Sequence, residues 1–305
     1  MALLATGKSP EEGRRAVELL EAAAAEGNAA AMERLALFEA TGIGRPLDWN
    51  RALDRLAEAA ELGNVAAQSQ LLILADPDDG AASAPMGEGW AAVRHRIDIK
   101  GRLSCPASPT PLSSRPWVRT VERFATAAEC RWIVGLAQDR RTPAEVVTDA
   151  GTQEQMPVRT NSKIAFQLAH MDVVMEVLRA RIAAACRLPL PLFESTQVLH
   201  YAPGQEFRPH RDYLDEANPA HRPLLADAGQ RIMTVLVYLN DGYEGGATDF
   251  PLAGLSFKGT IGDALMLGNV DRSGRPDPST LHAGCPPTSG EKWILSQWIR
   301  DRPQG

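Results

Sequence analysis

The chain has 305 residues, of which 44% are hydrophobic and 23% are charged, and its formal net charge is −6 at pH 7. This composition is typical of a soluble globular protein, and the length suggests about two domains. The acidic balance argues against a dedicated nucleic-acid-binding protein, although it does not exclude a local basic groove.

The N-terminus and the cysteines bear on the cellular compartment. Residues 1–7 form a short apolar run without the basic region of an export signal, and no run approaches the roughly 18 apolar residues that span a bilayer. The four cysteines are widely spaced and form no CxxC pair, which favours reduced thiols. We therefore expect a cytoplasmic protein without a membrane partner.

The first part of the chain, about Ser9 to Ala75, repeats itself. The pair Gly27-Asn28 recurs as Gly63-Asn64, an offset of 36 residues. A fixed period in this range is typical of stacked helix-turn-helix units, and the pattern resembles two Sel-like repeats, relatives of the tetratricopeptide repeat. We expect each glycine to end the first helix of a pair, and a third, partial unit to cover about residues 87–97.

Segments rich in Pro, Ala, Ser and Gly at residues 76–85 and 105–115 are predicted to be connections. We place the domain boundary near residue 110. A small all-α repeat domain with its linker then covers residues 1–110, and a second domain covers residues 111–305.

The second domain has an α+β pattern. Thr126 and Glu129 form a capping box at the start of one predicted helix, and a second helix is predicted to open at Asp172. Short strands follow, bounded by Gly, Pro or Asp. They are predicted at residues 196–201, 231–239, 264–267 and 292–299. This pattern favours a double-stranded β-helix, or jelly roll, with helices backing one sheet.

A candidate metal site lies on one of the short strands. Residues i and i+2 of a strand point to the same face, so His210 and Asp212 can present an imidazole and a carboxylate to one ion. With the distal His282 they form a two-histidine, one-carboxylate triad that suits non-haem Fe(II) and leaves coordination positions open. Zinc hydrolases also use three protein ligands and an open site.

The stretch from about Trp117 to Arg300 resembles the prolyl 4-hydroxylase family of Fe(II)/2-oxoglutarate dioxygenases. The resemblance rests on several ordered motifs. They are Tyr201, Gly204, Phe207, His210 and Asp212, then Gln230-Arg231, Thr234 to Leu239, Glu244 to Thr248, Gly262 to Ala264, His282 to Pro286, Gly290, Lys292-Trp293 and Trp298-Ile299. The family fold is also a jelly roll.

A lysine follows the last metal ligand by ten residues. Lys292 shares strand parity with Ile294, Ser296 and Trp298, which predicts that it points into the barrel. A buried lysine requires an anionic partner. That partner is either a structural Asp or Glu or, as the resemblance implies, the distal carboxylate of 2-oxoglutarate, with Tyr201 and Thr248 donating hydrogen bonds beside it.

The resemblance implies hydroxylation of a C–H bond, with O2 consumed and succinate and CO2 released. Fe(II) and 2-oxoglutarate would be required, with ascorbate as reductant. The triad residues would be both metal ligands and catalytic residues. Related halogenases lack the carboxylate supplied here by Asp212, which favours hydroxylation over halogenation.

The implied substrate contacts are Arg159, Glu194, Phe207, Arg231 and Trp298. Phe207 stands where family members that hydroxylate proline have Tyr, and Arg300 stands where some have His. We expect a peptidyl or protein substrate, with proline favoured and with the helical repeats as a docking surface. The alternatives are a hydroxylase of a small free molecule and a non-catalytic binding protein that uses the repeats. The polar, Pro-rich segment Tyr213–Gly229 is a candidate mobile lid.

Overall fold

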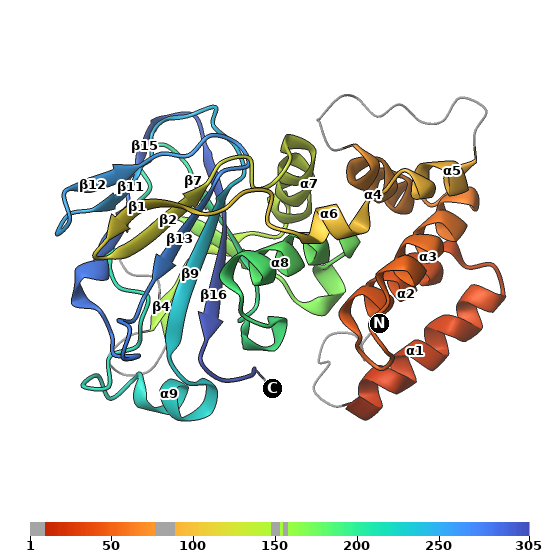
Figure 1. Ribbon diagram of the computed structural model, residues 1–305, viewed down its shortest axis with the longest axis horizontal. Helices are drawn as coiled ribbons and strands as arrows, with labels where there is room; N and C mark the ends of the chain where they lie inside the picture. The colour runs from red at the N-terminus through yellow and green to blue at the C-terminus, as the bar shows by residue number, and fades with distance from the viewer. Residues whose placement is uncertain (1–9, 77–88, 148–152, 155–157, 305) are drawn as a thin grey trace. The chain divides into compact units, whose positions relative to one another are not determined.

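The computed structural model describes residues 10–76, 89–147, 153–154 and 158–304. The chain divides into two compact units (Figure 1). The helical unit comprises residues 1–105 and Gln167–Cys186, and the β unit comprises Pro106–Phe166 and Arg187–Gly305. Among the helices described, none has the length and apolar character needed to cross a membrane.

The helical unit is built from two consecutive helix pairs and shorter helices that follow. Gly27 and Gly63 both adopt φ 83°, a left-handed conformation that glycine reaches without a Cβ penalty. The next residues, Asn28 and Asn64, each accept a hydrogen bond from the backbone N–H three residues on, at 3.0 and 2.9 Å. The same turn is thus built twice, at the predicted offset. The helices are α1 (Pro10–Ala25), α2 (Ala29–Thr41), α3 (Trp49–Glu61), α4 (Val65–Ala75), α5 (Trp90–His95) and α6 (Ile99–Leu103).

Helix α5 falls within the segment expected to hold a third, partial unit, of which residues 87–88 lie outside the described residues. Most of the connection expected at residues 76–85 also lies outside them. The connection expected at residues 105–115 is partly wrong, because Thr110–Ser114 forms strand β1. This strand pairs with its neighbour through backbone groups, which Pro- and Ser-rich composition does not reveal.

Helix α8 (Val173–Cys186) belongs to the helical unit. It opens where predicted, with the Asp172 carboxylate accepting the Met175 N–H at 2.9 Å. Its first N–H, from Val173, donates to the buried Gln70 amide of α4 at 3.0 Å, and Gln70 donates to Glu33 of α2 at 2.9 Å. A single sequence boundary at residue 110 assigns α8 to the second domain, whereas these long-range contacts join it to the first.

The β unit contains two antiparallel sheets of different size (Figure 1). The large sheet has the order β1-β2-β13-β9-β16-β7-β6-β3, and the small sheet has the order β12-β11-β14-β8. The large-sheet strands are β1, β2 (Trp117–Val121), β3 (Thr142–Pro143), β6 (Ser162–Ala165), β7 (Gln197–Tyr201), β9 (Arg231–Tyr238), β13 (Ala264–Gly268) and β16 (Lys292–Arg300). The small-sheet strands are β8 (Phe207–His210), β11 (Thr248–Phe250), β12 (Leu255–Phe257) and β14 (His282–Gly284).

Two further strand pairs, β4 (Val146–Val147) with β5 (Gln153–Glu154) and β10 (Glu244–Gly245) with β15 (Pro287–Ser289), lie outside the two sheets. Apolar side chains of both sheets form one core, in which Phe250 of the small sheet packs with Tyr238 and Leu265 of the large sheet. Two packed sheets of antiparallel strands confirm the predicted double-stranded β-helix.

Helix α7 (Ala127–Gln138) backs the large sheet. It begins with the predicted capping box, in which Thr126 and Glu129 satisfy each other's backbone N–H groups. The Cys130 thiol lies 3.8 Å from the carbonyl of Tyr238 in β9, so the helix is held against the sheet.

Strand β16 lies in the middle of the large sheet, between β7 and β9, and is buried along its whole length. Lys292, Ile294, Ser296 and Trp298 all line one pocket, which confirms the parity predicted for this strand.

Candidate active site

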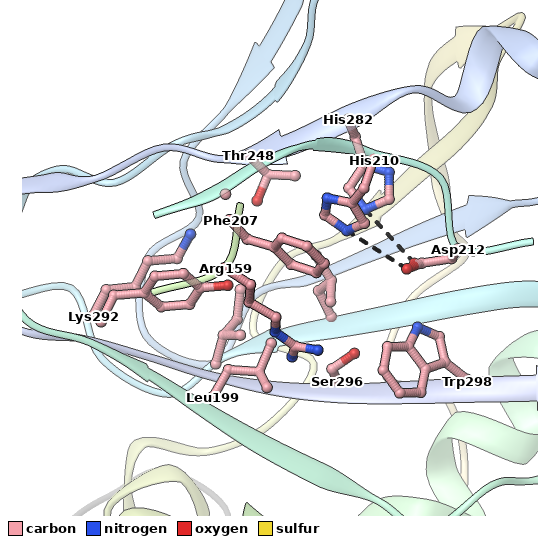
Figure 2. Close-up of a pocket in the computed structure, with 14 residues that line it drawn as sticks. Arg159, Leu199, Phe207, His210, Asp212, Thr248, His282, Lys292, Ser296 and Trp298 are labelled. Atoms are coloured by element: carbon pink, nitrogen blue, oxygen red, sulfur yellow. Dashed lines mark ion pairs between the residues drawn. The ribbon is translucent and has the colours of Figure 1, made fainter. Parts of the chain in front are cut away.

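Two neighbouring strands of the small sheet bring the three proposed metal ligands together. His210 ends β8 and lies opposite His282, which begins β14, in the antiparallel register. Asp212 lies in the bend just after β8, so the expectation that it shares the strand with His210 is wrong. The bend still aims its carboxylate at both rings: the Nε2 atoms of His210 and His282 lie 3.7 and 3.6 Å from its oxygens (Figure 2).

Hydrogen bonds from the far side fix the orientation of each ligand. His210 Nδ1 lies 2.8 Å from the carbonyl oxygen of Arg208, and His282 Nδ1 lies 2.9 Å from that of Thr280. A carbonyl can only accept, so each Nδ1 carries the proton and each Nε2 lone pair faces the site. The donor atoms of the three ligands all lie within 4.8 Å of one another.

The residues that orient the carboxylate were not predicted from the sequence. The Thr234 hydroxyl of β9 donates to Asp212 Oδ2 at 2.7 Å, and the Asn269 amide donates to Thr234 Oγ1 at 2.9 Å. Both residues are buried. Thr234 begins one of the family motifs, but nothing in that motif predicts its contact with Asp212. Asn269 has no local sequence signal, because it contacts Thr234 from 35 positions away.

Burial and mutual proximity set the protonation of the triad. Desolvation, together with the neighbouring His282, lowers the pKa of His210. Burial alone would raise the pKa of Asp212, but the adjacent His282, His210 and Arg231 and the Thr234 hydrogen bond outweigh it and lower the pKa. At neutral pH the site therefore offers a neutral imidazole and a carboxylate, which are the forms that bind a metal ion.

A buried lysine lies in the same pocket as the triad. Lys292 is 1% exposed, and its ammonium makes no hydrogen bond or ion pair with any described residue. Burial lowers the pKa of Lys292 to about 8. Its Nζ lies 5.2 Å from the ring centre of Tyr201 and 5.7 Å from that of Tyr238. Lys292 and Asp212 occupy opposite sides of the view in Figure 2, with Arg159 and Phe207 between them.

The other expected co-substrate contacts lie beside this lysine. Tyr201 and Thr248 line the pocket with it, and both are buried. The Thr248 hydroxyl lies 2.8 Å from the hydroxyl of Tyr238, a residue of the predicted strand for which no role was predicted. Burial raises the pKa of Tyr201 to about 12, so its hydroxyl keeps its proton and can donate.

The five expected substrate contacts form two groups. Arg159, Phe207 and Trp298 line the metal pocket, where Phe207 stacks on His210 with ring centres 3.4 Å apart. Glu194 and Arg231 line a wider cleft outside it, joined by an ion pair of 2.6 Å, and Arg231 lies 3.7 Å above the Trp298 ring. The structure thus brings all five residues to connected sites.

Arg300 completes the second group, with its Nε 2.5 Å from the carboxylate of Glu194. Burial alone would raise the pKa of Glu194, but the two arginines outweigh it and lower the pKa. The carboxylate therefore binds both arginines, whose Nε atoms share its Oε1 atom.

The segment Tyr213–Gly229 contains helix α9 (Arg222–Ala228) where a polar loop was expected. Gln230 anchors its start, because the Gln230 amide exchanges two hydrogen bonds of 2.7 Å with the backbone of Leu214. Leu214, His221 and Leu224 line the outer cleft. The local order of Tyr213–Gly229 comes from its turns and from the hydrogen bonds between Gln230 and Leu214.

Comparison with known proteins agrees with this geometry. Residues 196–300 match the 2OG-Fe(II) oxygenase superfamily. A probable prolyl 4-hydroxylase 10 of Arabidopsis thaliana is 32% identical over 251 residues, which cover 75% of this chain and 84% of the relative. The chain belongs to the prolyl 4-hydroxylase family of 2OG-Fe(II) oxygenases. Prolyl 4-hydroxylase 1 of the same plant is 33% identical over 211 residues, covering 64% of this chain and 72% of the relative.

Among solved structures, a viral collagen prolyl hydroxylase from Paramecium Bursaria Chlorella virus-1, in its 2OG complex, is 27% identical, with a TM-score of 0.45. The match covers 60% of this chain and 94% of that protein.

The residues of this chain fit the Fe(II) and 2-oxoglutarate that the family uses. Two Nε2 donors and an ionised carboxylate converge on one point, and the buried ammonium lies in the same pocket. The protein is therefore a 2-oxoglutarate-dependent dioxygenase, with His210, Asp212 and His282 as its facial triad.

The contact from Thr234 to Asp212 generates a prediction about metal affinity. Thr234→Val keeps the shape of the side chain but removes the donor to the carboxylate and the acceptor for Asn269. We expect metal binding to weaken about 10- to 100-fold, as for other residues that orient ligands. Competition between the protein and a chelator for Co(II) measures this. The control Thr234→Ser keeps the hydroxyl and should bind normally. Equal affinity of the Val variant would remove Thr234 from the metal site.

Proposed function

We propose that this protein hydroxylates a C–H bond of a peptidyl residue, with proline favoured. The observation that carries the proposal is a single pocket that holds both the facial triad and a buried ammonium, and that adjoins a wider cleft. The triad and the ammonium match a dicarboxylate co-substrate. The cleft, of about 550 Å³, is in the range of ligand sites and has room for part of a peptide.

The buried lysine and its neighbours would hold the distal carboxylate of 2-oxoglutarate. The Lys292 ammonium supplies the positive charge, and the hydroxyls of Tyr201 and Thr248 supply hydrogen-bond donors. Tyr238 bonds to Thr248 and so helps to set the direction of that hydroxyl. Charge-assisted hydrogen bonds are stronger than those between neutral groups. The contacts with Lys292, Tyr201 and Thr248 would therefore fix the position of the co-substrate in the pocket.

Bound iron supplies the oxidising chemistry, with O2 as oxidant, 2-oxoglutarate converted to succinate and CO2, and ascorbate as reductant. The chain itself binds, orients and excludes water. His210, Asp212 and His282 would hold the ion and, as only three protein ligands, would leave coordination positions for other molecules. Phe207 covers one face of the His210 ring and keeps that face from water.

The outer residues would position the substrate. Glu194 fixes Arg231, and Arg231 stacks on Trp298, so three side chains form one wall of the cleft. Arg159 lines the same pocket as the triad, with its guanidinium 4.5 Å from the ring centre of Phe207. A wall of fixed side chains would hold the target C–H bond at a constant distance from the metal, which is how positioning accelerates a reaction.

A hydroxylase of a small free molecule is a second candidate, because the inner pocket and its triad would serve it equally well. A non-catalytic binding protein is less well supported. The ligand atoms converge, each ligand accepts or donates a supporting hydrogen bond, and Lys292 is buried in the same pocket.

The reaction is tested by incubating the full-length protein with Fe(II), 2-oxoglutarate, ascorbate and a library of proline-containing peptides. We expect one oxygen added to proline, found by mass spectrometry, and an equal amount of succinate. His210→Ala, Asp212→Ala and His282→Ala should each abolish both products, and Co(II) or Ni(II) should inhibit by displacing Fe(II). Succinate without any oxidised peptide, but with an oxidised small molecule, would favour the second candidate. Absence of succinate would favour the binding protein.

We further propose that the N-terminal helices are Sel-like repeats that recruit a protein substrate. Two observations support this: the turn with its glycine and asparagine cap is built twice, and apolar side chains remain exposed near the second copy. Leu62 is 54% exposed and Val65 is 73% exposed. The alternative is a structural brace, since two repeats are fewer than a stable solenoid needs.

Recruitment is tested with the double variant Leu62→Ser and Val65→Ser. We expect fewer oxidised sites in the native proteins of a cell extract, but unchanged oxidation of tryptic peptides from the same extract, because short peptides need no docking. Leu252→Ser is a matched control, since Leu252 is 62% exposed in the β unit. Equal oxidation of native proteins by the double variant and the wild type would contradict recruitment.

A further inference from the structure

The outer cleft is basic, although the chain as a whole is acidic. Outside the metal triad, the described residues that line it include five basic side chains and two carboxylates. The cations are Arg159, Lys163, Arg211, Arg231 and Arg300, and the carboxylates are Glu145 and Glu194. Without the triad the lining carries a formal charge of +3, and with Asp212 included it carries +2, on a chain of net charge −6. A cleft of one sign raises the local concentration of ligands of the other sign.

Ion pairs inside the cleft leave three of these cations without a carboxylate. Glu194 neutralises part of the charge of Arg231 and Arg300, because it bonds to both. Among the described residues, no carboxylate lies within ion-pair distance of Arg159, Lys163 or Arg211. Arg211 donates its Nε to the carbonyl of Pro278 at 3.0 Å, so its charge stays uncompensated.

Arg159 is the most buried of the three cations. It is 6% exposed, and its Nη2 is buried without a hydrogen-bond partner in the described structure. Its other donors reach neutral oxygens, Asn161 Oδ1 at 3.2 Å and the Glu145 carbonyl at 3.4 Å. Burial lowers the pKa of Arg159, which expresses the cost of keeping the charge there. The charge of Asp212 offsets part of this cost, but no carboxylate of the described residues pairs directly with Arg159. A buried cation without an ion-pair partner favours a ligand that supplies one.

Lys163 points to the same face of the sheet as the metal pocket. It lies opposite Leu199 in the β6–β7 register, and Leu199 lines that pocket. Cross-strand partners share a face, which places the ammonium at the rim of the cleft. Burial, then the charge of Arg159, lowers the pKa of Lys163, and the charge of Glu145 offsets only part of this effect. Lys163 and Arg159 are therefore close enough to repel each other. A carboxylate between them would relieve this repulsion.

We propose that the substrate is an acidic peptide, in which a carboxylate close to the oxidised residue binds between Arg159 and Lys163, while Arg211 adds to the positive charge of the cleft. The carboxylate comes from an Asp or Glu side chain or from a free C-terminus. This assignment rests on the proposed peptidyl oxidation. A neutral peptide would leave three cations without an anion, and a basic peptide would add to their repulsion.

The test compares four peptides that differ only in the charge around one central proline. Three have blocked ends and carry Glu, Gln or Lys on both sides of the proline. The fourth carries Gln before the proline and has a free C-terminal carboxylate just after the proline. KM is measured with the full-length enzyme, Fe(II), 2-oxoglutarate and ascorbate, at low and high ionic strength. Direct binding is measured by fluorescence anisotropy with the Co(II)-loaded protein and 2-oxoglutarate.

We expect a carboxylate-bearing peptide to have the lowest KM and the Lys peptide the highest, with the difference shrinking as salt rises. Lys163→Gln should raise the KM of the preferred acidic peptide about two- to fivefold, the range for one partly exposed ion pair, and leave that of the Gln peptide unchanged. Lys163→Glu should shift the preference toward the Lys peptide. Arg140→Gln is the matched control, because Arg140 is exposed and lies outside the cleft lining.

The outcomes separate this inference from the function on which it rests. Oxidation of the Glu, Gln, Lys and free-carboxylate peptides with equal KM would overturn the inference while the peptidyl activity stands. Preferential binding of an acidic peptide without oxidation would support the charge assignment and contradict proline oxidation. No binding of any peptide would overturn both. If a single-stranded oligonucleotide binds more tightly than the acidic peptides, and if Lys163→Glu abolishes this tighter binding, the cleft is instead a nucleic-acid site.

Discussion

A buried ammonium without a carboxylate partner is the constraint on which the site depends. Lys292 opens the central strand β16, which is paired on both sides and cannot shift without breaking the sheet. Burying a charge is costly unless an anion compensates it, and no described residue supplies that anion. The fold therefore holds a buried positive charge that lacks an ion-pair partner, and we propose that the dicarboxylate co-substrate of the family supplies the negative charge. This pairing would explain why a lysine occupies a buried position in the barrel.

The rest of the site is built around that pocket by strand pairing. The register of β8 and β14 places His210 opposite His282, and the bend after β8 turns Asp212 toward both. The far sides of the ligands are then fixed by groups of three kinds: backbone carbonyls for the imidazoles, Thr234 for the carboxylate, and Asn269 behind Thr234. Each ligand is held in place before the metal binds, which lowers the cost of binding it.

Much of this site could be predicted from the sequence because its signals are local or periodic. The triad, the parity of Lys292 and the capping box of α7 each depend on residues close together in the chain or on a family motif. Other features depend on contacts between distant residues and left no such signal. The hydrogen bond from Val173 of α8 to the Gln70 amide links residues 103 positions apart in the chain. Thr110–Ser114 forms strand β1 because it pairs with β2. The same is true of Thr234 and Asn269, which look like ordinary core residues until their partner is known.

The affinity for 2-oxoglutarate, compared with that for 2-oxobutyrate, tests the central claim most directly. The second acid keeps the metal-binding end and lacks the distal carboxylate. With Co(II)-loaded protein at neutral pH, 2-oxoglutarate should bind about 10- to 100-fold more tightly. This advantage should fall as the pH rises above about 8, where the ammonium loses its proton. Lys292→Met should abolish it. Equal affinity for the two acids, or an advantage that persists in Lys292→Met, would contradict the account and make Lys292 a structural residue.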